Sequence, residues 1–516
     1  MGILSAGGTV EGSGQAHPLS NETDTRVIEG YLWRESIVVG EQLHIHASTD
    51  AAFFRVDLYR IGAVPEFAGS AGCFPGRYGP APAHPDGVAD HASPAVDWYW
   101  PAYEFTTPSH WNPGVYVAFF VESGSDTPLV TAETGRPPGD VPYDVDDLKG
   151  HGREFFILRP CVPGGAKILY KKSSFTRHAY NRSDGPGIER ASSLYDNAVY
   201  VSGDGVEPRG HKVSMHRPGG IDDLAYWDAP FIAWLERAGY QVEFCTDLDL
   251  HSDPELLSFY RLLLSVGHDE YWTTEMRVNV ETFVEAGGNV AFFSANTCWW
   301  RVHVTDSGTA LVADTDHRVG EVYPHQPATD QWWAPKPSGA GVPENTMTGV
   351  SFRNGGMWPG QWPGDRPCPG FTVQHADHWV YEGTGLRDSS DGGMADVLGA
   401  GLPLIGYECD GAAFRYVGDG VARATGTDGT PESFLILGIA VLEPVHEDLH
   451  DIRKGYWNCA SREVGTTGPR AATMGVYTRN GTVFTAATTD WPVIVARGCD
   501  EGVDRVTRNV LDRLSS

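Results

Sequence analysis

The sequence predicts an N-terminal β-sandwich over residues 26–160, followed by an α/β domain with an open parallel sheet over residues 161–516. Three observations predict this order. Short strand-like segments separated by Pro- and Gly-rich turns fill the first part, and strands alternate with helices from about Lys167 onward. The chain's 516 residues also exceed the roughly 250–300 that one hydrophobic core serves. Residues 1–25 are expected to form a flexible N-terminus, and residues 302–400 a long loop insertion.

The first domain is predicted from strands whose residues alternate or favour β-structure, at 43–47, 54–59 and 114–121. In the second domain we expect strands at 166–170, 241–245, 261–266 and 289–293. Helices are expected at 228–239 and 273–287, the latter capped by Thr273 or Thr274 and ended by Gly287. Strands at 432–441 and 481–487 and a helix at 500–514 complete the same domain.

The composition excludes several classes of protein. A formal charge of −29 and a pI of about 4.9 repel phosphate backbones, so nucleic acid is not expected as a partner. No apolar run approaches the 18 residues of a membrane span, and the first residues lack the pattern of a signal peptide. The eight cysteines form no CxxC pair. We therefore expect a cytoplasmic protein whose cysteines are mostly reduced structural thiols.

Candidate catalytic residues follow the ends of two predicted buried strands. The strand at 261–266 runs into His268, Asp269, Glu270 and Tyr271, directly before a helix N-terminus. In open α/β sheets, ligands bind beyond the carboxyl ends of the strands, so we favour a functional role for these residues. The alternative is that the two acids cap the helix and the aromatic residues pack.

Other candidates are weaker. Asn296 follows the strand at 289–293 and is a suitable carbonyl or oxyanion binder, whereas the nearby Cys298 is expected to be a buried thiol. Glu408 and Asp410 flank a cysteine at another predicted strand end, where either could be a base or a metal ligand. The alternative is that they form ion pairs on the surface. Tyr226 stands just before a helix, as a site residue or a packing aromatic.

Several segments resemble one known family. This chain resembles the large (beta) subunit family of N,N-dimethylformamidase in the segments GHDEYWTTEMR (267–277), WLERAGYQVEFCTDLDLH (234–251), SANTCWWRV (294–302), RNGG (353–356), GYECDG (406–411), GTVFTAATTDW (481–491) and TRNVLDRL (507–514). YRIG (59–62) and SHWNPGVYVAFF (109–120) resemble that family's β-sandwich. The likeness spans nearly the whole chain, and GHDEYW is its most distinctive part. The α/β domain also resembles the class I glutamine-amidotransferase fold without its catalytic cysteine.

The resemblance implies an iron-dependent hydrolase of a small molecule's C–N amide bond. In that family a mononuclear iron, here expected as Fe3+, is held by two tyrosines and a glutamate. Tyr271 matches one tyrosine, and Tyr226 is the best match for the second. The family's acidic block is Thr348-Gly349-Val350 here, so Glu344 is the expected third ligand, with Glu408 as the alternative.

The implied reaction is attack of metal-activated water on the amide carbonyl. His268 or a carboxylate, Glu270 or Glu408, would take the water proton, and Asn296 would orient the carbonyl. Aromatic residues in 299–379 would form an apolar lid over a small substrate.

Two other readings stay open. One is a metal-dependent Lewis-acid enzyme of secondary metabolism, such as a cyclase. The other is a non-catalytic protein that binds carbohydrate or a partner. Homo-oligomerisation and a small accessory subunit are both expected possibilities.

Overall fold

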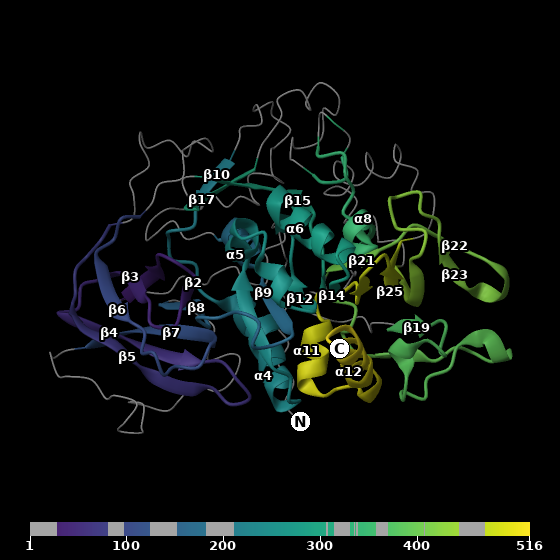
Figure 1. Cartoon of the computed structure of the whole chain (residues 1–516), viewed down its shortest axis with the longest axis horizontal. Coiled ribbons are helices and arrows are strands. Elements are labelled where there is room, and N and C mark those ends of the chain that lie inside the picture. The colour runs from purple at the N-terminus through teal and green to yellow at the C-terminus, as the bar shows by residue number, and fades with distance from the viewer. Residues whose placement is uncertain are drawn as a thin grey trace, which may run out of the picture.

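The computed structural model describes residues 28–80, 98–123, 152–181, 211–305, 308–313, 331–334, 336, 339–357, 370–406, 408–442 and 470–516. The N-terminus expected at 1–25 and parts of the insertion expected at 302–400 lie outside these residues. The described chain is mixed α/β, with many strands in several sheets and few helices. Figure 1 shows the N-terminal strands on one side, the largest sheet in the centre and the C-terminal helices below it.

The N-terminal strands form two sheets that face each other across one core, as the predicted β-sandwich requires. Their orders are β1-β3-β6 and β2-β8-β7-β4-β5. The strands are β1 (Ile28–Leu32), β2 (Ser36–Val38), β3 (Gln42–Thr49), β4 (Phe53–Arg60), β5 (Glu66–Pro75), β6 (Ala102–Thr106), β7 (Gly114–Ser123) and β8 (Arg153–Arg159). Leu43 and Ile45 of one sheet share a buried cluster with Val56 and Phe156 of the other. The predicted strands 43–47, 54–59 and 114–121 lie within β3, β4 and β7.

The larger sandwich sheet is buried on both faces. Tyr116 and Phe156 point into the sandwich core, whereas Val115 and Phe155, the preceding residue of each strand, join the core of the α/β part. Because neighbouring residues of a strand point to opposite faces, β7 and β8 carry runs of consecutive apolar residues, at 114–121 and 155–158. The sandwich therefore packs its outer face against the rest of the protein.

The central sheet has the order β11-β9-β12-β14-β26-β25-β24-β19-β20. Its strands are β11 (Val242–Thr246), β9 (Ile168–Lys172), β12 (Leu262–His268), β14 (Asn289–Ala295), β26 (Thr482–Thr485), β25 (Ala471–Thr478), β24 (Leu435–Val441), β19 (Phe371–Val373) and β20 (Val397–Leu398). The first five are parallel, but β25, β24, β19 and β20 pair antiparallel. The prediction of an open parallel sheet is thus wrong for nearly half of the strands.

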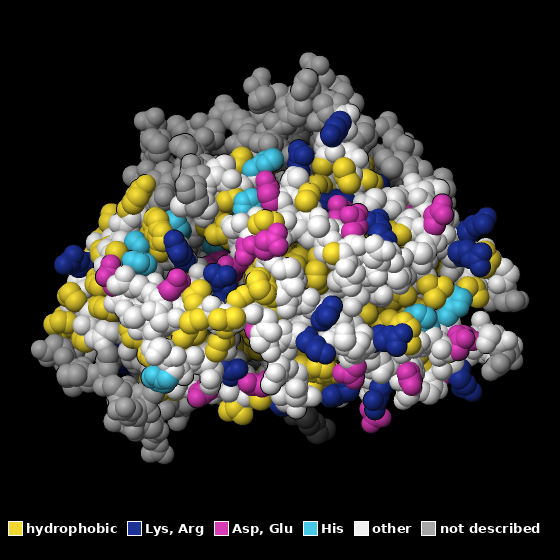
Figure 2. Space-filling model, viewed as in Figure 1, with side chains coloured by type: hydrophobic (Ala, Val, Ile, Leu, Met, Phe, Trp, Pro, Cys, Tyr) yellow, Lys and Arg dark blue, Asp and Glu magenta, His cyan; other side chains and the backbone are white. Residues whose placement is uncertain are grey.

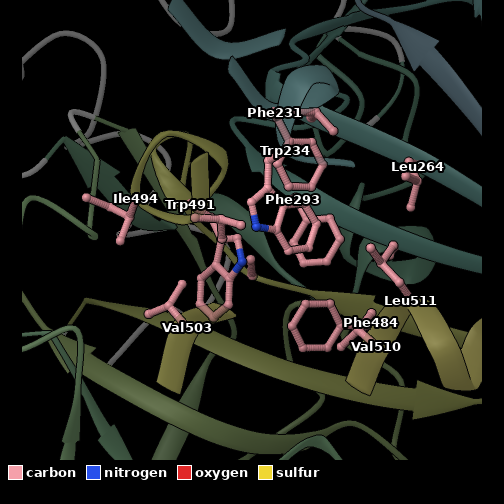
Figure 3. Packing of buried hydrophobic residues seen from close by; sticks show 14 of the residues in the cluster. Phe231, Trp234, Leu264, Phe293, Phe484, Trp491, Ile494, Val503, Val510 and Leu511 are labelled. Atoms are coloured by element: carbon pink, nitrogen blue, oxygen red, sulfur yellow. The ribbon is translucent and has the colours of Figure 1, made fainter. Parts of the chain in front are cut away.

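Helices cover both faces of the parallel half. They are α2 (Ser174–Tyr180), the π-helical turn η2 (Leu224–Asp228), α4 (Ala229–Arg237), α5 (Asp247–Ser252), α6 (Thr274–Glu285), α11 (Trp491–Arg497) and α12 (Glu501–Leu514). Figure 3 shows Phe231 and Trp234 of α4 packed with Trp491 of α11 against Phe293 of the sheet. Met276 and Phe283 of α6 pack on the other face.

Local signals explain the helix boundaries. The Thr273 side chain accepts a hydrogen bond from the backbone of Met276, which selects Thr273 of the two predicted caps of α6. Asp500 caps α12 in the same way, through the backbone of Val503. Gly239 follows α4 with φ +87, where a side chain would be strained.

Short strand pairs lie around the central sheet. They are β10 (His211–Ser214) and β16 (His303–Thr305) with β17 (Ala310–Ala313), β13 (Tyr271–Trp272) with β15 (Trp300–Arg301), β18 (Ser351–Met357) with β21 (Glu408–Gly411), and β22 (Phe414–Tyr416) with β23 (Ala422–Ala424). The short helix α8 (Asn345–Thr348) precedes β18. The region expected as a long insertion thus contains short strands, and two of them, β19 and β20, belong to the central sheet.

The surface agrees with the composition. In Figure 2, described Lys and Arg side chains are intermixed with Asp and Glu side chains on the visible face, and do not gather into a basic strip. Among the described helices, none has the length and apolar content that crossing a membrane requires.

Candidate functional site

The strand order places a switch point at the carboxyl ends of β9 and β12. β9 has β11 on one side and β12 on the other, so the chain crosses in one direction after β9 and in the opposite direction after β12. Such a reversal leaves the loops at the carboxyl ends splayed apart, which is where open α/β sheets bind ligands. Residues from the ends of β9, β12, β14 and β26 meet at this edge.

Four residues predicted from the sequence come together here, and we call them the carboxyl-edge cluster: His268, Glu270, Asn296 and Glu408. His268 Nε2 lies 2.9 Å from a Glu408 oxygen and 3.2 Å from a Glu270 oxygen. The side-chain nitrogen of Asn296 is 3.4 Å from the same His268 atom. All four side chains are buried. One imidazole is thus held between two carboxylates and beside one amide.

The charges of the cluster keep His268 protonated. Burial alone would lower the pKa of His268, but the charge of Glu408 and the hydrogen bonds of both glutamates outweigh it and raise the pKa to about 10. Burial also raises the pKa of Glu270, against the effect of His268. At neutral pH the centre of the cluster is therefore an imidazolium.

Alternation along the strands explains why these residues meet. Glu408 and Asp410 are two apart on β21, so both point to the same side. Glu408 contacts His268, and Asp410 accepts hydrogen bonds from the backbone N–H groups of Asn296 at 2.9 Å and Thr297 at 3.3 Å. Burial raises the pKa of Asp410 to about 8.

Three residues that sequence reasoning did not select complete the surroundings. The Tyr180 hydroxyl donates to Glu270 at 2.5 Å, and its ring lies 5.3 Å from His268. Trp227 lies 6.1 Å from His268 on another side and donates through Nε1 to Asp490 at 3.1 Å. Tyr180 stands shortly after β9 and Asp490 shortly after β26. The strand-end rule could therefore have selected both.

A glycine keeps Trp227 beside His268. Gly267 has φ +75, and a Cβ placed there would lie 2.7 Å from Trp227 Cγ. Gly267→Ala is expected to lower the free energy of unfolding by roughly 2–4 kcal/mol, from backbone strain plus overpacking. Gly239→Ala is the matched control, since Gly239 has φ +87 with nothing within 4 Å, and should cost about 1–2 kcal/mol. If urea denaturation shows that Gly267→Ala and Gly239→Ala lose equal free energy of unfolding, the close packing of Trp227 on Gly267 is contradicted.

A second buried charge network includes Asp269, the residue between His268 and Glu270 of the cluster. Lys171 Nζ is fully buried and lies 2.6 Å from Asp247 and 2.8 Å from Asp269, with the ring of Trp272 4.7 Å away. Asp269 also accepts from Ser265 at 2.5 Å. This network fixes the backbone from which Glu270 and Tyr271 extend.

The three implied iron ligands come from different elements: Tyr271 from β13, Tyr226 from η2, and Glu344 from the residue before α8. Tyr271 is buried, with its ring 5.9 Å from Tyr180. Tyr226 lies against Trp227, and burial and Asp490 raise its pKa. Glu344 accepts from Ser351, and burial raises its pKa against the charge of Arg353.

Two further structural facts bear on a metal. Among the described residues, no group of three or more His, Cys, Asp or Glu side chains is placed to hold an ion. The family's acidic position, Val350, is buried in an apolar cluster.

Cys298 and the predicted aromatic lid are part of the core. Cys298 is fully buried, and burial raises its pKa well above the usual value, as expected for an unreactive thiol. Trp299 packs 6.1 Å from Trp333 and 5.5 Å from Phe352, and all three are buried. In the described part of the insertion these aromatic residues are buried, and they share one apolar cluster with Tyr271.

Comparison with known proteins adds one finding. The profile of the family described as N,N-dimethylformamidase beta subunit-like, C-terminal, matches residues 55–501. That range includes the carboxyl-edge cluster, the central sheet and most of the larger sandwich sheet. Among curated proteins, none matches the chain significantly.

Proposed function

Because the chain belongs to the N,N-dimethylformamidase beta subunit-like family, we propose that it hydrolyses a C–N amide bond of a small molecule at the carboxyl-edge cluster. One observation carries this proposal: His268 is held between the carboxylates of Glu270 and Glu408, beside Asn296, at the switch point of the sheet. Amide hydrolysis needs a positive or hydrogen-donating group for the carbonyl oxygen and a base for water, and this cluster contains both.

His268 supplies the positive charge. The sequence left open whether His268 or a carboxylate takes the proton from water. With a pKa of about 10, His268 already carries its proton at neutral pH, so it cannot be the base. Its charge instead stabilises the negative charge that develops on the carbonyl oxygen.

Asn296 can donate to that oxygen. Its Oδ1 is buried with no hydrogen-bond partner among the described residues, and its Nδ2 lies near His268 Nε2. A protonated imidazole nitrogen donates, so the Asn296 carbonyl must face it, and a half-turn of the amide group achieves this without moving other atoms. The NH2 group is then directed toward the bound carbonyl.

Glu408 is the base in this proposal. Its side chain is 9% exposed and that of Glu270 is 3% exposed, so Glu408 is the carboxylate that water reaches more easily. Glu270 is held by Tyr180 and keeps His268 in place. Glu408 takes a proton as water adds to the carbonyl, and returns it to the nitrogen as the C–N bond breaks. The products are a carboxylic acid and an amine.

A panel of small formamides and acetamides tests the proposal. We expect at least one to be cleaved, and Glu408→Gln to lower that rate by roughly 10²–10⁴-fold, because glutamine cannot accept the proton. Glu382→Gln is the control, since Glu382 is exposed and far along the chain from the cluster. A wild-type protein that cleaves no amide, or a fully active Glu408→Gln variant, would contradict the proposal.

Iron remains a prediction from the family. Phenolate and carboxylate oxygens suit ferric iron, which would polarise the carbonyl and acidify bound water. Tyr271, Tyr226 and Glu344 are the residues that would hold it.

Elemental analysis of protein purified without chelator tests that prediction. The family likeness predicts about one iron per chain, and loss of that iron in Tyr271→Phe, because the phenylalanine ring offers no oxygen ligand. Tyr240→Phe is the control, since the Tyr240 hydroxyl bonds Asp512 on the surface. Wild-type protein without iron would contradict an iron enzyme, and unchanged iron in Tyr271→Phe would exclude Tyr271 as a ligand.

Two further features follow from the same family. We propose a small accessory subunit or self-association, which the mass of the native protein in solution tests. A cytoplasmic location is also proposed, and Cys245 and Cys298 take part in no disulfide.

A further inference from the structure

The turn that carries Asn296 has a strained backbone. Asn296 has φ +50 and Cys298 has φ +59, although neither is glycine. Such conformations are unfavourable for side-chain-bearing residues and persist only where surrounding contacts impose them. The turn directly follows β14, whose last residue, Ala295, pairs with His268. Its shape therefore decides whether the Asn296 side chain reaches His268.

Two buried acceptors hold the backbone of this turn, and the hydroxyl groups of Ser294 and Thr297 bond each other across it at 2.9 Å. The Asp410 carboxylate accepts from the backbone N–H of Asn296 at 2.9 Å and of Thr297 at 3.3 Å. The backbone carbonyl of Asp269 accepts from Cys298 at 2.9 Å. Asp410 is 1% exposed, so no water competes for the two N–H groups. Of these acceptors, only Asp410 acts through its side chain and can be removed by substitution.

Asp410 is itself fixed in position. Its backbone N–H donates to Ala487 at 3.0 Å, and its strand β21 pairs with β18. Glu408, on the same side of the same strand, contacts His268. One strand therefore delivers both the proposed base and the carboxylate that holds the Asn296 turn.

We propose that Asp410 is a positioning residue: by accepting the N–H groups of Asn296 and Thr297, it holds the Asn296 amide beside His268 in the orientation that binds the substrate carbonyl. The inference rests on the proposed function for its catalytic consequence. The structural claim, that Asp410 holds the shape of the turn, does not depend on the proposed function.

A double-mutant cycle tests the catalytic consequence, using the amide that the wild type cleaves fastest. Asp410→Ala removes both acceptors and is expected to lower kcat about 100-fold, with KM changed less than about three-fold, because the bound carbonyl loses an aligned donor. Asn296→Ala should give a similar loss. The double variant should be no slower than either single variant, since Asp410 acts through Asn296.

Asp410→Asn provides the conservative comparison. Its side-chain oxygen can still accept the shorter bond from Asn296, while its NH2 group cannot accept from Thr297. We expect the kcat of Asp410→Asn to be at least ten-fold higher than that of Asp410→Ala. Asp428→Asn is the control, because Asp428 is also buried and accepts backbone N–H groups from Ala413 and Thr430, away from this turn. It should leave kcat unchanged.

Crystal structures of the two Asp410 variants test the structural claim without any substrate. In Asp410→Ala the turn should relax, with Asn296 leaving its positive φ and its amide leaving His268; in Asp410→Asn it should be retained. An unchanged turn in Asp410→Ala overturns the inference, as does a full further loss of kcat when Asp410→Ala is added to Asn296→Ala. If no amide is cleaved, the proposed function fails, and the crystal structures alone decide the role of Asp410.

Discussion

Replacing His268 with glutamine is expected to lower amide hydrolysis by roughly 10²–10⁴-fold and the free energy of unfolding by about 3–5 kcal/mol. The substitution removes the positive charge that lies between Glu270 and Glu408 and leaves two buried carboxylates facing each other. Neither can be solvated, because both side chains are almost fully buried. Urea denaturation at neutral pH measures the loss of stability, and the amide assay measures the loss of rate.

The stability effect has a defined pH dependence. Folding raises the pKa of His268 from 6.5 to about 10, so its contribution is complete below pH 6.5 and is lost as pH rises through 10. The difference in stability between the wild type and His268→Gln should therefore shrink over that interval. Adding Glu408→Gln to His268→Gln should restore part of the stability at pH 7 without restoring activity. A His268→Gln protein as stable as the wild type would contradict a charged His268.

The second large effect is expected at Lys171. Lys171→Met should lower the free energy of unfolding by about 3–5 kcal/mol, because the fully buried Asp247 and Asp269 lose the ammonium group that both contact. The methionine chain fills similar volume, so the loss reports charge more than packing. Denaturation by urea, monitored by tryptophan fluorescence, measures the change.

Two variants give this measurement its controls. Lys167 directly precedes β9, but its side chain is exposed. The free energy of unfolding of Lys167→Met should therefore stay within about 0.5 kcal/mol of the wild-type value. Adding Asp247→Asn to Lys171→Met removes one uncompensated charge and should recover part of the loss. If Lys167→Met costs as much as Lys171→Met, the buried network does not have the stabilising role given to it here.

The sequence predicted the parallel strands well, because each is an apolar run bounded by turn residues. β12 and β14 agree closely with the segments expected at 261–266 and 289–293. The antiparallel half was missed for a physical reason. β25 and β24 carry the same kinds of apolar residues as the parallel strands, and pairing direction is set by the connections between strands, which composition does not reveal.

The site followed the same pattern. The rule about strand ends selected His268, Glu270 and Asn296, because each lies within a few residues of a buried strand. Tyr180 and Asp490 also follow strand ends, β9 and β26, and the same rule could have selected them. Trp227 reaches the site from the turn before α4, and its contact with His268 depends on helix placement that local sequence does not encode. The roles of all these residues, and of iron, stay predictions that the variants above test.

The larger sandwich sheet has a practical consequence for dissecting this protein. Val115, Val117, Phe155 and Ile157 belong to the core shared with the α/β part. A fragment ending after β8 would expose these side chains to solvent as one contiguous apolar patch, a feature that promotes aggregation. The N-terminal sandwich is therefore not a module that can be expressed on its own. The binding and kinetic measurements require the intact chain.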